Sequence, residues 1–117
     1  MNILIVEDEV LSAMFLKHSL EKNKNFSIDL VTTGENAIKY AIENNPEIIL
    51  MDIKLAGGID GIEVSEKINL VYQPRIIFIT GYQSKELQKE TKKIPNSFII
   101  EKPINMKDLL KCIFDSN

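Results

Sequence analysis

Short apolar runs recur along the chain and are separated by longer, more polar stretches. Four of the five runs are continuously apolar, which is typical of strands covered on both faces. The second run lies within residues 26–30, where apolar and polar side chains alternate, so we expect it at an edge of a sheet. The pattern predicts five strands, at residues 3–6, 28–31, 48–51, 76–79 and 98–100.

The stretches between the runs carry apolar residues at helical spacing. Asp60 and Asn105 precede two of them and are suited to cap a helix, because their side chains accept hydrogen bonds from the first turn. The first stretch has four large apolar residues near helical spacing: Val10, Leu11, Met14 and Phe15. The pattern predicts five helices, around residues 10–20, 37–42, 60–68, 84–93 and 105–114.

Strands and helices therefore alternate, which is typical of an α/β fold with a parallel sheet and helices on both of its faces. Right-handed crossovers limit such a sheet to a few doubly wound strand orders. The 117 residues contain no stretch rich in Pro, Gly or Ser that would separate domains. We expect one domain over residues 1–117.

Composition excludes several classes of protein. The single cysteine, Cys112, rules out a disulfide framework and a cysteine-based metal site, and it fits a reducing compartment such as the cytoplasm. The apolar runs are too short to span a bilayer, and acidic residues follow the first run too early for a signal peptide. A net charge of −3 argues against direct binding of nucleic acid or anionic lipid.

Chemistry-bearing side chains stand directly after four of the predicted strands. Ligands of open parallel sheets bind beyond the carboxyl ends of the strands. If the first and third strands are neighbours, three carboxylates meet at one edge and would repel one another unless a cation compensates them. Oxygen ligands favour Mg²⁺. A cation, an ammonium and a hydroxyl beside a carboxylate would suit phosphoryl transfer to that carboxylate. These residues are Glu7, Asp8, Asp52, Thr80 and Lys102.

The sequence resembles the response-regulator receiver domains of two-component signalling over essentially its whole length. The resemblance implies a doubly wound five-stranded parallel sheet of order 2-1-3-4-5, with five helices on both faces in three layers. It also implies a signalling switch rather than an enzyme acting on other substrates. It rests on segments that occur in order, each near a strand end: residues 3–9, 49–53, 60–63, 77–81 and 102–103.

The resemblance further implies a role for each site residue. Asp52 would accept the phosphoryl group from a partner's phosphohistidine. Thr80, the backbone N–H of Gly81 and Lys102 would hold that group, and a cis peptide would join Lys102 to Pro103. The Mg²⁺ ligands would be Glu7, Asp8, Asp52 and the backbone carbonyl of Lys54.

Partners follow from the same resemblance. A sensor histidine kinase or a phosphotransfer protein would supply the phosphoryl group. The face formed by the fourth helix, fifth strand and fifth helix would then change its partners. The downstream effector is not identified by the sequence, and it could be an output domain attached in a longer chain.

One position departs from the family pattern. Many receivers carry an aromatic residue three positions before the lysine, where this chain has Ile99, while Phe98 belongs on the opposite face of the strand. A bulge at Glu101 would shift the register and change that assignment. The fourth helix has Leu87 as its only strongly apolar residue, so we expect it to be loosely held.

Three other classes of function compete with the switch. Aspartyl-phosphate phosphohydrolases need a second Asp two residues after the nucleophile, where this chain has Lys54. A flavodoxin-like cofactor carrier would need a phosphate-binding loop rather than acids after the first strand. A receiver that binds partners without phosphorylation stays open because of Ile99, although the site residues form a complete set.

Overall fold

The computed structural model describes residues 1–55 and 59–115. The strands are β1 (Asn2–Val6), β2 (Ser27–Val31), β3 (Ile48–Asp52), β4 (Arg75–Thr80) and β5 (Ser97–Glu101). The helices are α1 (Val10–Glu21), α2 (Gly34–Asn44), α3 (Gly61–Asn69), α4 (Lys85–Lys92) and α5 (Met106–Phe114). None of these helices is long and apolar enough to cross a membrane.

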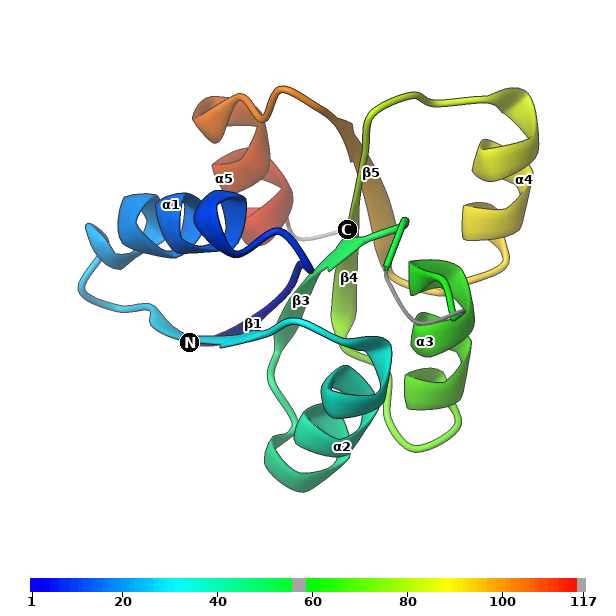
Figure 1. Cartoon of the computed structure of the whole chain (residues 1–117), viewed down its shortest axis with the longest axis horizontal. Helices are drawn as coiled ribbons and strands as arrows, with labels where there is room; N and C mark the ends of the chain where they lie inside the picture. Colours follow the sequence, from blue (N-terminus) through cyan, green and yellow to red (C-terminus); the bar gives the residue numbers. More distant parts are fainter. Residues whose placement is uncertain (56–58, 116–117) are drawn as a thin grey trace.

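All strand pairs are parallel, and the order β2-β1-β3-β4-β5 confirms the expected doubly wound sheet. Helices α1 and α5 cover one face, and α2, α3 and α4 lie on the other (Figure 1). Successive residues of each strand point to opposite faces, so the strands contribute to both of the hydrophobic cores. The result is the three-layer arrangement that the alternating pattern predicted.

Burial across the sheet follows strand position. Every residue of β3 is buried, and β1 and β4 are buried along nearly their whole length. At one edge, β2 buries Ile28 and exposes Ser27 and Asp29, as its alternating pattern predicted. At the other edge, the first three residues of β5 are only half-buried, because no further described strand pairs with it.

Helix α1 turns its large apolar residues toward solvent, which the helical spacing alone did not indicate. Leu11 is 80% exposed and Phe15 is 73% exposed, while Val10 and Met14 are also more than half exposed. The helix packs on the sheet instead through smaller or later positions. Its buried residues are Ala13, Leu16 and Leu20.

Four of the described helices, α2 to α5, begin at side-chain caps. Asp60 accepts a hydrogen bond from the backbone N–H of Glu63 at 2.9 Å, and Ser84 does the same for α4. Asn105 accepts from two N–H groups in the first turn of α5, which confirms its predicted role. Within α4 only Thr91 is fully buried, in keeping with a helix that has little apolar surface to anchor it.

Arg75, the first residue of β4, connects the sheet to the end of α5. Its guanidinium donates hydrogen bonds to the carbonyl oxygens of Cys112, Ile113 and Asp115. The same group lies 5.1 Å from the centre of the Phe98 ring, within the range of a cation–π contact. These bonds occupy carbonyls that a helix C-terminus ordinarily leaves unpaired.

Candidate functional site

Three carboxylates meet where β1 and β3 end. The two strands are neighbours, with Val6 opposite Met51, so the residues that follow them leave the sheet at the same edge. Glu7, Asp8 and Asp52 each place one carboxylate oxygen within 4.8 Å of the others. Glu7 and Asp52 are buried and Asp8 is exposed, so the cluster is closed on the core side and open to solvent on the other.

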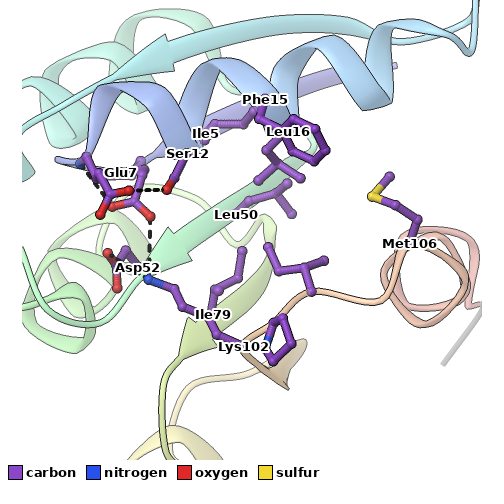
Figure 2. A pocket seen from close by; sticks show the side chains of 14 residues that line it. Ile5, Glu7, Ser12, Phe15, Leu16, Leu50, Asp52, Ile79, Lys102 and Met106 are labelled. Carbon is purple, nitrogen blue, oxygen red and sulfur yellow. Dashed lines mark hydrogen bonds and ion pairs between the residues drawn. The ribbon is translucent and has the colours of Figure 1, made fainter.

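Lys102 supplies a positive charge at the same place. Its Nζ lies 3.6 Å from Oε1 of Glu7 and 3.7 Å from Oδ2 of Asp52 (Figure 2). Each carboxylate also accepts a backbone hydrogen bond that fixes its direction. The N–H of Glu9 donates to Glu7 at 3.1 Å, and the N–H of Lys54 donates to Asp52 at 3.2 Å.

The electrostatics of the cluster favour an added cation. Burial raises the pKa of Glu7 to about 7, and its hydrogen bond with Asp52 acts in the same direction. Lys102 lowers the pKa of Glu7, but its effect is smaller than those that raise it. The donors are all oxygens, which suits a hard divalent ion such as Mg²⁺.

Thr80 ends β4, beside the strand that carries Asp52, and Gly81 follows it. The hydroxyl of Thr80 lies 3.1 Å from the carbonyl oxygen of Tyr82, to which it donates, and 3.3 Å from the backbone N of the same residue. Thr80 is therefore bound to the loop before α4 in this conformation. A methyl group added at Gly81 would meet open space, so the backbone there is accessible from outside.

The structure decides two expectations about the segment around Lys102. The Lys102–Pro103 peptide bond is cis, as the resemblance implied. Pairing of β4 with β5 runs without a break to Glu101, so the alternative register with a bulge is wrong. Phe98 packs on the side of α1 and α5, whereas Ile99 packs on the side of α2, α3 and α4. The aromatic ring is therefore on the opposite face from the family's usual position.

Gly61 has a role that sequence reasoning did not assign. Its N–H donates to the carbonyl of Ile53 at 2.8 Å, which draws the start of α3 against the end of β3. A Cβ at this position would lie only 2.3 Å from the backbone oxygen of Asp52. The glycine thus permits the contact that holds the strand end in place. The sequence feature that could have indicated this role is its position directly after the Asp60 cap.

The comparisons with known proteins agree with this geometry. The family model described as "Response regulator receiver domain" matches residues 3–114. The regulator PhyR of Methylorubrum extorquens is 36% identical over 102 residues, covering 86% of this chain and 38% of its own length. The response regulator ArlR of Staphylococcus haemolyticus is 37% identical over 80 residues, covering 68% of this chain and 36% of its own.

Solved structures match as well. A two-component response regulator from Clostridium difficile superimposes with a TM-score of 0.88 at 26% identity, covering 97% of this chain and 92% of that one. The signal receiver domain of a modulated diguanylate cyclase from Desulfovibrio desulfuricans gives 0.82 at 33% identity, with coverages of 96% and 89%. This chain spans little more than a third of the length of PhyR and ArlR. It belongs to the receiver domain family of two-component response regulators.

Proposed function

We propose that this receiver is a phosphorylation switch in which Asp52 takes a phosphoryl group from a phosphohistidine of a sensor kinase or phosphotransfer protein. The observation that carries the proposal is the grouping of Glu7, Asp8 and Asp52, with the Lys102 ammonium 3.7 Å from Asp52. An oxygen of Asp52 forms the new bond to phosphorus as the bond from phosphorus to the imidazole nitrogen breaks. Proton transfer to the departing imidazole completes the step.

The cluster is suited to hold Mg²⁺ during this step. Its ligands would be Glu7, Asp8, Asp52 and the backbone carbonyl of Lys54. A bound Mg²⁺ supplies charge neutralisation between the carboxylates and the incoming phosphoryl oxygens. The backbone N–H groups that donate to Glu7 and Asp52 hold both carboxylates in position, so the site needs little rearrangement.

The phosphoryl group would be held by Lys102, the hydroxyl of Thr80 and the backbone N–H of Gly81. Binding it requires Thr80 to exchange its present partner, Tyr82, for a phosphoryl oxygen. That exchange would move the loop before α4, and α4 itself has little buried surface to resist the movement. We therefore place the change of partners at the face formed by α4, β5 and α5.

The proposal also covers the location and the output of the protein. The protein acts in the cytoplasm and catalyses only its own phosphorylation and dephosphorylation. Its output passes to an effector, which an attached domain could provide, because the related regulators PhyR and ArlR are longer than this chain. Direct binding of nucleic acid by this domain is not expected.

Intact-mass measurement after incubation with Mg²⁺ and an acyl phosphate tests the proposal. We expect one added phosphoryl group on the parent protein and none on Asp52→Asn. Asp108→Asn, an exposed carboxylate on α5, serves as the matched control and should be labelled like the parent. Labelling of Asp52→Asn as efficiently as the parent would overturn the assignment of the acceptor.

Calorimetric titration with Mg²⁺ tests the metal ligands separately. Asp8→Asn should weaken Mg²⁺ binding at least about tenfold, because it removes one of the carboxylates that the ion would share. Asp108→Asn should bind Mg²⁺ like the parent. Unchanged affinity in Asp8→Asn would move the ion to another place.

A further inference from the structure

A cavity of 320 Å³ opens beside the carboxylates, between α1 and the segment that leads from β5 into α5. Side chains from β1, β3 and β4 form its floor, while α1 and the start of α5 form its walls (Figure 2). Most of the side chains that line it are apolar. The residues that define it are Ile5, Leu16, Leu50, Ile79, Ile104 and Met106.

One end of the cavity is charged and predominantly negative (Figure 2). Among the described residues that line it, Glu7, Glu9 and Asp52 carry carboxylates and Lys102 carries an ammonium. Glu9 is exposed and points its carboxylate toward Ser12, whose hydroxyl donates a hydrogen bond to it. A mainly apolar cavity with an excess of carboxylates at one end is complementary to a molecule with an apolar body and a cationic end.

The volume of the cavity limits the size of the ligand's apolar part. A cavity of about 150 Å³ lined by aliphatic and aromatic side chains is known to hold one benzene molecule. The volume of 320 Å³ is therefore about twice what a single aromatic ring needs. It leaves room for a short chain that would carry a cationic group from the ring to the carboxylates.

We propose that this cavity binds a small arylalkylamine, with the ring against Leu16 and Ile79 and the ammonium between Glu7 and Glu9. Such binding would also regulate the protein, a consequence that rests on the proposed function. Because Glu7 would also bind Mg²⁺, the ammonium and the metal compete for the same carboxylate. A bound amine therefore opposes phosphorylation of Asp52 and keeps the receiver in its unphosphorylated state.

Three probes of the same shape and different charge test the site: phenethylamine, phenethyl alcohol and hydrocinnamate. Each is titrated into the metal-free protein at about pH 8, while the methyl resonances are followed by NMR. We expect the amine to bind about fivefold or more tightly than the alcohol, and hydrocinnamate to bind most weakly. The methyl groups of Ile5, Ile79 and Ile104 should shift. The proposal fails if those methyl groups do not respond, or if hydrocinnamate binds as tightly as the amine.

Two variants separate the cationic end from the apolar body. Glu9→Gln should weaken the amine by about two- to fivefold and leave the alcohol unchanged, because it removes one charge at the carboxylate end of the cavity. Met106→Trp should weaken both probes by filling the cavity. Leu70→Trp, at an 85% exposed position that follows α3, is the matched control and should change neither. Equal loss of amine and alcohol in Glu9→Gln would contradict the placement of the ammonium.

Competition with Mg²⁺ tests the regulatory consequence. We expect Mg²⁺ to raise the apparent Kd of the amine and to leave that of the alcohol unchanged. Metal-free binding does not depend on phosphorylation, so the cavity is tested even if Asp52 proves not to be the acceptor. If the amine binds and Mg²⁺ binds without displacing it, the two do not share Glu7 and the regulatory consequence is wrong.

Discussion

Replacing Glu7 by Gln should stabilise the fold above neutral pH when no Mg²⁺ is present. Glu7 is 11% exposed at its side chain and lies against a second carboxylate, Asp52. In the folded protein burial raises its pKa from 4.5 to about 7. Gln has nearly the same shape as the protonated acid and can still donate a hydrogen bond to Asp52, but it carries no charge.

The size and sign of the effect follow from this shift. Folding favours the protonated form of Glu7, so its contribution is fully present below pH 4.5 and is lost as the pH rises through about 7. One pKa unit corresponds to about 1.4 kcal/mol, so the shift from 4.5 to about 7 gives a loss of at most about 3.5 kcal/mol by about pH 8. The variant has no such group and should lose none of this stability.

Urea denaturation at about pH 5 and about pH 8, with a chelator present, measures the difference. The parent should lose up to about 3 kcal/mol of unfolding free energy between the two conditions, and Glu7→Gln clearly less. Glu66→Gln, an exposed position on α3, is the matched control and should behave like the parent. An identical loss in the parent and in Glu7→Gln would refute the assignment of the pH dependence to Glu7.

Other consequences of the structure are open to direct measurement. Gly61→Ala should cost about 3 kcal/mol in urea denaturation, because its Cβ would lie 2.3 Å from the oxygen of Asp52. Gly81→Ala, which meets open space, should cost less than about 0.5 kcal/mol, and equal losses would contradict the contact. Asn105→Ala should cost about 1 kcal/mol through loss of the α5 cap, and Asn105→Ser should restore most of it. Backbone amides of α4 should exchange faster than those of α1 by mass spectrometry; equal protection would show that α4 is firmly held.

The fold was predictable from the apolar runs, and the carboxylate cluster was predictable from the residues that follow the strands. Continuous apolar runs indicated buried strands, and parallel pairing brings the residues after β1 and β3 to one edge. That rule predicted that Glu7, Asp8 and Asp52 lie together. It needed the direction of each strand and the strand order, which the family resemblance implied.

Side-chain orientation was less accessible to sequence reasoning. Leu11 and Phe15 lie at helical spacing in α1, yet they face solvent, because the smaller Ala13 and the later Leu16 pack on the sheet. Hydrophobic spacing shows that a helix has an apolar stripe but does not show which neighbour covers it. The bond between Thr80 and Tyr82 likewise depends on loop geometry that no local pattern specifies.

The hydrogen bonds of Arg75 should make the last turn of α5 more resistant to local unfolding than most helix ends. Last turns of helices ordinarily fray, because their carbonyls lack partners and the residues there open independently of the rest. Here those carbonyls are bound by a side chain rooted in β4, so the last turn can open only by breaking bonds to the sheet. The final turn of α5 should therefore unfold with β4 as one cooperative unit. The last turn of α5 would then be rigid, in contrast to the weakly anchored α4.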